Sequence, residues 1–459
     1  MSNTQPKIAI ACQGGGSLTA YQAGMLARLL KEAHVRHVNN QARVFLSLPA
    51  KAFGKKSDGK IEFELVGISG TSGGAQNAAI AWNACVTGNP AGAEATLQHW
   101  WNAISAHADD LSMSGGLTHT MVRMYDSLLT FLNLQVQQRQ NAFDSTIRET
   151  FIAQMRSELP KSLWDGPETR KIHDLPLYVA SMEAISGTFV CFMVGAKYSE
   201  KYQKSGIEPM RKLDPRFLMA SACIPELFTE QTLPMSQRAS NTFRKNQSVR
   251  LAEPSLRTKG LISPEEAKAR WSMDEPLEGQ YWDGLYSENP PISPFLRFSN
   301  EDLKPDEILI LRINPRTVPE SIDEPTRLVD RQNELIGNLS LTQEIHSIKK
   351  VNGFLKKWYD LGVKPDDKIT LGMKPVAVRE IDLPWQEQEK LRYSDKLARR
   401  PEEIRRRMDV GYEWADLFLT GTKNQLTDWA EPDFTSANTK PVADKPVRAP
   451  AKTREPEHA

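Results

Sequence analysis

The segment Gly70-Thr71-Ser72-Gly73-Gly74 constrains the fold most, because it has the G-x-S-x-G spacing of a nucleophile elbow. The apolar run 63–68 predicts a short strand before it, and the small apolar residues of 75–84 predict a helix after it. At such a strand-to-helix turn the serine hydroxyl projects from the backbone, and the flanking glycines leave room for the bend. The pattern makes Ser72 a candidate nucleophile.

Strands and helices alternate along most of the chain, which indicates an α/β fold with a largely parallel central sheet. The other predicted strands are 7–12, 177–182, 188–194 and 308–313. The other predicted helices begin after the glycines at 14–16 and then cover about 93–106, 121–134, 144–159, 326–359 and 401–419. A polar stretch of about 229–279 interrupts this pattern as an insertion, either a lid or a solvated loop. The proline-rich, charged tail 430–459 is expected to be disordered.

Composition narrows the functional classes. Lysine and arginine (58 residues) nearly balance aspartate and glutamate (57), so a nucleic-acid partner is not expected. Four scattered cysteines in apolar stretches predict buried, reduced thiols, and no residue cluster has metal-ligand spacing, so we expect neither metal nor cofactor.

Membrane contact, if made, is expected to be peripheral. No apolar run approaches the roughly 20 residues that span a bilayer, and the apolar run 8–12 is shorter than we expect for a signal peptide. We therefore expect a cytoplasmic protein whose contact with a membrane would be at its surface. Two basic stretches, Arg36 to Lys60 and Arg238 to Lys259, are candidates for contact with anionic headgroups, although such runs are commonly plain solvated surface.

Gly14-Gly15-Gly16 lies between a predicted strand and a predicted helix, and three interpretations compete. A dinucleotide-binding loop would need glycine at position 19, which is threonine, and an acidic residue about twenty positions later. A Walker loop would need Gly-Lys-Ser/Thr, which is absent. An oxyanion hole made of backbone N–H groups is the interpretation that also uses the serine elbow. A purely structural turn remains open.

A serine nucleophile needs a proton acceptor, and the expected histidine is not evident. Beyond residue 173 the chain has only His346, inside a predicted helix, and His458 in the tail. Asp283, at the end of a predicted strand and before Gly284, is the alternative base. A plain Asp-Gly turn explains the same residues equally well.

Together these motifs resemble the patatin-like phospholipases. The matching segments are Gly14 to Gly16, 20–24, Gly70 to Gly74, 220–225, 281–284, 312–315 and 330–334. The last two resemble the C-terminal extension of a bacterial subgroup. The resemblance implies a patatin-like three-layer fold with helices flanking the sheet, a catalytic domain over 7–299, and a mainly helical extension over 300–428.

The resemblance also implies a Ser–Asp dyad with no histidine. Ser72 would be the nucleophile and Asp283 the proton acceptor. The N–H groups of Gly14, Gly15, Gly16 and Gly73 would form the oxyanion hole, with Gly70, Gly74 and Gly284 shaping the motifs. The implied substrate is a phospholipid or lysophospholipid.

Three residues depart from the family pattern: Leu18 and Thr19 at the glycine loop, and Leu285 after Asp283-Gly284. Thr19 and Leu285 favour a module without activity, and two alternatives stay open beside a lipid acyl hydrolase. One is a soluble esterase or thioesterase that uses the same dyad. The other is a non-catalytic lipid-binding module with the same fold.

Overall fold

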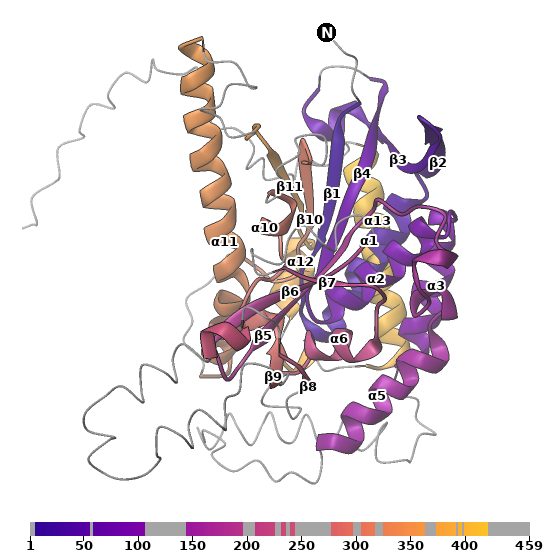
Figure 1. Ribbon diagram of the computed structural model, residues 1–459, viewed down its shortest axis with the longest axis vertical. Helices are drawn as coiled ribbons and strands as arrows, with labels where there is room; N and C mark the ends of the chain where they lie inside the picture. Colours follow the sequence, from indigo (N-terminus) through magenta and orange to yellow (C-terminus); the bar gives the residue numbers. More distant parts are fainter. Residues whose placement is uncertain are drawn as a thin grey trace, which may run out of the picture.

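A central sheet organises the part of the chain that the computed structural model describes, which is residues 5–55, 58–105, 144–195, 207–224, 231–235, 239–243, 277–296, 304–316, 325–362, 373–391, 393–396 and 399–420. Its main path runs in the order β11-β10-β1-β4-β5-β6-β7 (Figure 1). The strands are Lys7–Cys12 (β1), Ala33–Val38 (β2), Gln41–Pro49 (β3), Lys60–Gly70 (β4), Leu177–Glu183 (β5), Thr188–Val194 (β6), Ile207–Met210 (β7), Gln231–Pro234 (β8), Glu278–Asp283 (β9), Glu307–Leu311 (β10) and Ala377–Ile381 (β11). All pairings from β11 to β5 are parallel, whereas β6 and β9 run antiparallel to β5. The predicted α/β fold with a largely parallel sheet is confirmed.

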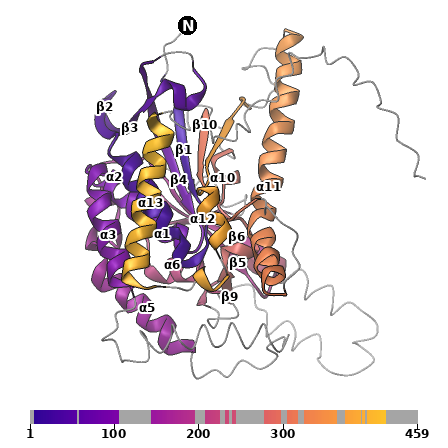
Figure 2. The ribbon, with the colours of Figure 1, turned by 180° about the vertical axis from the view of Figure 1, so that it is seen from behind.

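Helices cover both faces of the sheet, which makes three layers (Figures 1 and 2). The helices are Thr19–Leu30 (α1), Gly73–Val86 (α2), Ala93–Ala103 (α3), Asp144–Glu158 (α5), Pro215–Ala220 (α6), Ser293–Leu296 (α10), Pro325–Asp360 (α11), Trp385–Lys390 (α12) and Pro401–Thr420 (α13). Side chains alternate across a strand, so β1 serves both layers. Ile8 and Ile10 belong to the core beneath α1, α2, α3 and α13, whereas Ala9 and Ala11 face α10 and α11.

The predicted elements agree closely with the observed ones where the structure describes them. The strands predicted at 7–12 and 188–194 have the observed bounds, and the one at 63–68 is longer, beginning at Lys60. The long helix predicted at 326–359 is α11. The helix predicted at 121–134, most of the insertion at 229–279 and the tail at 430–459 lie outside the described residues. All four cysteines are buried and unbridged, as predicted.

The basic stretch Arg36 to Lys60 contains a β-hairpin that the sequence analysis did not predict. β2 and β3 pair antiparallel around Asn39 and Asn40, whose φ values are 50° and 61°. A two-residue hairpin turn of this kind requires the left-handed conformation at both residues. Asparagine tolerates that conformation better than most residues. The Asn-Asn pair was therefore the missed signal.

The region after residue 300 is built into the same sheet. β10 pairs with β1 on one side and with β11 on the other, both in parallel. On the opposite layer, α13 crosses α1 so closely that a Cβ at Gly411 would lie 2.6 Å from the Tyr21 carbonyl carbon. The predicted division at 299/300 stays a prediction, but the main-chain pairing runs across it. In the described part of the chain, no helix has the length and apolarity to cross a membrane.

Candidate active site

Ser72 occupies the sharp turn between β4 and α2. β4 ends at Gly70 and α2 begins at Gly73, which is the strand–turn–helix context predicted for an elbow. The Ser72 backbone has φ 56° and ψ −129°, a conformation that residues other than glycine rarely adopt. Such strain persists only where the surroundings hold it, and it is found preferentially at functional turns.

Glycine is needed on both sides of this turn because the backbone packs too closely for side chains. A Cβ at Gly70 would lie 2.6 Å from the Gly74 carbonyl carbon, and a Cβ at Gly74 would lie 2.7 Å from the Gln13 carbonyl oxygen. Gln13 follows directly after β1. Gly74 thus lets the first turn of α2 approach the segment from which the glycine loop starts.

The glycine loop, Gly14 to Gly16, lies directly against Ser72. A Cβ at Gly14 would lie 2.9 Å from the Ser72 Cβ, and a Cβ at Gly73 would lie 2.9 Å from the Gly16 carbonyl oxygen. Gly16 has φ +58°, in the left-handed region that favours glycine. The loop, Ser72 and the N-terminus of α2 therefore form one continuous backbone surface.

Asp283 ends β9, which pairs with β5 so that Asp283 is opposite Ser181. Its side chain is buried, and Oδ1 accepts a hydrogen bond of 2.7 Å from the Leu285 N–H. A Cβ at Gly284 would lie 2.8 Å from Thr71 Cγ2, which places the Asp-Gly turn beside the residue preceding Ser72. Segments more than 200 positions apart are thus brought together.

Ser221, to which the sequence analysis assigned no role, connects the two halves of the site. Its hydroxyl oxygen accepts a 2.9 Å hydrogen bond from the Ser72 N–H, and its carbonyl oxygen accepts one of 3.2 Å from the Gly284 N–H. Thr71 adds a second connection, since its hydroxyl donates to the Glu288 carbonyl at 2.7 Å. The only sequence signal for Ser221 was its place in a motif shared with the resembled family.

Comparison with known families assigns these elements to one domain. The model of the patatin-like phospholipases matches residues 10–296, more than half of the chain. The chain belongs to the patatin-like phospholipase family. The family consists generally of serine hydrolases acting on ester bonds, so the match places the chain in a family of lipid acyl hydrolases. No curated protein matches the chain.

A buried network of amides supports the glycine loop of the patatin-like domain from behind. The Gly14 N–H donates a 2.6 Å hydrogen bond to Asn289 Oδ1, and Asn314 Nδ2 donates to the Gly14 carbonyl at 3.1 Å. Gln13 Nε2 donates to Asn338 Oδ1 at 3.0 Å, and Gln13 Oε1 accepts from the Asn314 N–H at 2.9 Å. Asn314 and Asn338 belong to the region after residue 300, which therefore shapes the loop beside Ser72.

This network limits which backbone N–H groups of the glycine loop could donate to an oxyanion. Gly14 was predicted to be one of these donors, but its N–H group already donates a hydrogen bond to Asn289 Oδ1. The N–H groups of Gly15 and Gly16 donate no hydrogen bond to any part of the chain that the structure describes. No single residue pattern in the sequence pointed to Asn289, whose partner is 275 positions away.

The three departures from the patatin-like pattern fit the local structure. Thr19 has ordinary helical angles, φ −67° and ψ −4°, and its hydroxyl donates to the Gly16 carbonyl at 2.7 Å. Leu18 is buried in the core. Leu285 provides the N–H that holds Asp283 Oδ1. None of them distorts the turns that position Ser72 and Asp283.

His346, the remaining histidine candidate, lies on α11 with its side chain exposed. Within the described residues, His, Cys, Asp and Glu side chains form no group of three with metal-binding geometry. Of the residues predicted to act in catalysis, Ser72 and Asp283 lie on adjoining turns, with the glycine loop beside Ser72.

Proposed function

We propose that this protein hydrolyses carboxylic esters of phospholipids or lysophospholipids through a Ser72–Asp283 dyad. Asp283 takes the proton of the Ser72 hydroxyl as the serine oxygen attacks the ester carbonyl carbon. The ester C–O bond then breaks, and the protonated Asp283 returns the proton to the leaving alcohol. Attack by water on the acyl-serine, with the same carboxylate as base, releases the fatty acid and restores the free enzyme.

The observation that carries this proposal is the joint burial of the elbow and the aspartate. Ser72 has 6% and Asp283 has 1% of its surface exposed, and both belong to turns connected through Ser221. A site that is poor in water strengthens electrostatic interactions and suits a carboxylate acting as base.

For the oxyanion, we propose the N–H groups of Gly15, Gly16 and Gly73 as donors. Gly73 is the first residue of α2, where the helix terminus presents N–H groups that have no partner within the helix. Gly14 is not among these donors, because its N–H group holds the loop in shape through its hydrogen bond to Asn289. Such preorganised donors cost no rearrangement when charge develops.

Fatty-acid release from mixed phospholipid vesicles tests this proposal with four proteins: wild type, Ser72→Ala, Asp283→Asn and Asp306→Asn. The last is a matched control, since Asp306 is a carboxylate that binds Lys374 and the Lys7 N–H, away from the elbow. We expect release by wild type and Asp306→Asn, and none by the other two folded variants.

Other outcomes would point to the alternatives. A normal rate in Asp283→Asn would show that another group is the base. Hydrolysis of short esters without release from lipids would favour a soluble esterase, and no hydrolysis of either would favour a lipid-binding module.

A further inference from the structure

Exposed apolar side chains are concentrated on one element of the described structure, the helix α11. Eight large apolar side chains of the described residues are prominently exposed, and Ile185 is the single one outside α11 and the residue that follows it. The other seven, which we call the outer face of α11, are Leu328, Leu335, Ile336, Leu339, Val351, Phe354 and Leu361. These residues form two groups along the helix, 328–339 and 351–361, and exposed apolar side chains gathered on one element mark an interaction site more often than isolated ones do.

The outer face is opposite the face by which α11 packs on the sheet. Leu341, Ile345, Ile348 and Leu355 are buried, and their spacing of three, four and seven residues defines one side of the helix. Both views show α11 along the outside of the sheet, next to β10 and β11 (Figures 1 and 2). α11 therefore also carries large apolar side chains on the side turned away from the sheet, although only one apolar side is needed to bury the core.

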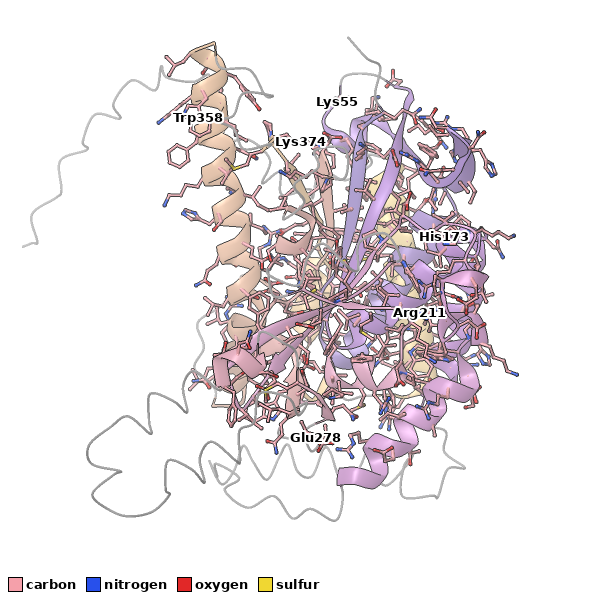
Figure 3. The ribbon with its side chains drawn as sticks, viewed as in Figure 1. Lys55, His173, Arg211, Glu278, Trp358 and Lys374 are labelled. Atoms are coloured by element: carbon pink, nitrogen blue, oxygen red, sulfur yellow. The ribbon has the colours of Figure 1, made fainter. Side chains whose placement is uncertain are left out.

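Basic side chains accompany the apolar ones in the C-terminal half of α11. Lys350, Lys356 and Lys357 are exposed there, and Asp360 is the exposed acidic residue between positions 346 and 361. Trp358 lies in the same part of the helix, far from Glu278 at the start of β9 (Figure 3). Exposed apolar and aromatic residues with lysines are typical of helices that lie in the interface of an anionic membrane.

The basic stretch that the sequence analysis selected for membrane contact has a different use. Arg36 pairs with Glu62 at 2.8 Å, and Arg43 pairs with Glu64 at 2.7 Å. These acidic residues lie on β4, so the arginine charge is neutralised within the hairpin and its neighbouring strand. The other selected stretch, Arg238 to Lys259, falls almost wholly outside the described residues.

The N-terminal half of the outer face lies close to the candidate active site. Ile336 and Leu339 flank Gly337 and Asn338, which contact Gln13 just before the glycine loop. A helix with its side chains is about 10 Å in diameter. The outer face is therefore about one helix diameter from the amide network behind the glycine loop. A surface bound to the N-terminal half of the outer face would be held beside the elbow.

We propose that the outer face of α11 docks onto an anionic phospholipid bilayer. The lysines interact with the headgroups, and the leucine and phenylalanine side chains enter the boundary between headgroups and acyl chains. The proposed function supplies the reason for such docking, but binding can be measured without hydrolysis. Failure of one is therefore distinguishable from failure of the other.

The test is sedimentation of the full chain with vesicles, in the Ser72→Ala background so that the lipid stays intact. Vesicles of equal parts phosphatidylglycerol and phosphatidylcholine are compared with vesicles of phosphatidylcholine alone. We expect binding to the anionic vesicles, and a loss of about tenfold or more in affinity for Leu339→Glu and for Phe354→Glu. Lys350→Glu should weaken binding in the anionic vesicles specifically.

Ile185→Glu is the matched control, because Ile185 is 47% exposed and Phe354 is 52% exposed, yet Ile185 lies between β5 and β6. It should bind like the parent protein. In the active background, Phe354→Glu should keep its rate on a soluble short-chain ester and lose rate on vesicles. Equal binding by all variants would overturn the proposal. So would a dimer in solution that Leu339→Glu or Phe354→Glu dissociates, because a second copy would then cover the face.

Discussion

Replacing Asn289 by alanine should slow turnover by disturbing the glycine loop without touching the nucleophile. Asn289 is fully buried, and its side chain accepts from the Gly14 N–H at 2.6 Å and donates to the Gly337 carbonyl at 3.2 Å. Leaving a buried N–H group without an acceptor costs about 1–3 kcal/mol. If the glycine loop must return to its wild-type shape to stabilise the transition state, the same free energy is added to the activation barrier. kcat then falls about 5- to 150-fold.

Asn352→Ala is the control, because Asn352 makes a similar pair of hydrogen bonds on α11, away from the glycine loop. Asn352 donates to the Val376 carbonyl at 2.9 Å and accepts from the Val376 N–H at 3.1 Å, far along the helix from the loop. Thermal unfolding and the kinetics of a soluble ester are measured for both variants. We expect both to lose stability and only Asn289→Ala to lose kcat, with KM nearly unchanged. A full kcat in Asn289→Ala, or an equal loss of kcat in Asn352→Ala, would show that Asn289 does not act through the glycine loop.

Three further variants test other contacts. Ser221→Ala removes the acceptor of the Ser72 N–H, so steady-state kinetics should show a kcat lowered about tenfold or more, whereas an unchanged kcat would contradict the role of that bond. Gly16→Ala forces φ +58° on alanine and sets a Cβ against the Lys396 backbone, so denaturant unfolding should show a loss of about 1–3 kcal/mol; wild-type stability would count against the geometry. The pKa of Glu403 is lowered from its ordinary 4.5 mainly by an arginine hydrogen bond, so its stabilising effect is present above pH 4.5 and lost on acidification. The stability difference between wild type and Glu403→Gln should therefore shrink below pH 4.5, and a difference that grows there would be contrary to this sign.

Local pattern was sufficient for most of the fold. The apolar runs of β1 and β6 and the period of α11 depend on residues close in sequence, and their bounds were predicted closely. The hairpin β2–β3 was missed because its strands are polar on one side and its turn uses Asn39 and Asn40 instead of glycine. The joining of β10 to β1 depends on a contact between positions 300 residues apart, which no local pattern encodes.

Some residues of the candidate site could be predicted from local sequence, and others could not. Ser72 and Gly14 to Gly16 lie in short motifs whose geometry follows from nearby glycines, so the sequence alone indicated them. Asn289 and Ser221 act through long-range hydrogen bonds to backbone groups, and asparagine and serine are too common for such a role to be visible in sequence. The outer face of α11 was hidden because its apolar residues resemble those of a core helix until the packing is known.

Covalent labelling by a fluorophosphonate tests directly whether Ser72 is the nucleophile, because the reagent reacts with an activated serine hydroxyl and stays covalently attached to that residue. After labelling of the full-length protein, peptide mass spectrometry locates the adduct. We expect a single adduct on the peptide carrying Ser72, absent in Ser72→Ala and formed much more slowly in Asp283→Asn. An unlabelled wild type, or an adduct that persists in Ser72→Ala, would contradict it.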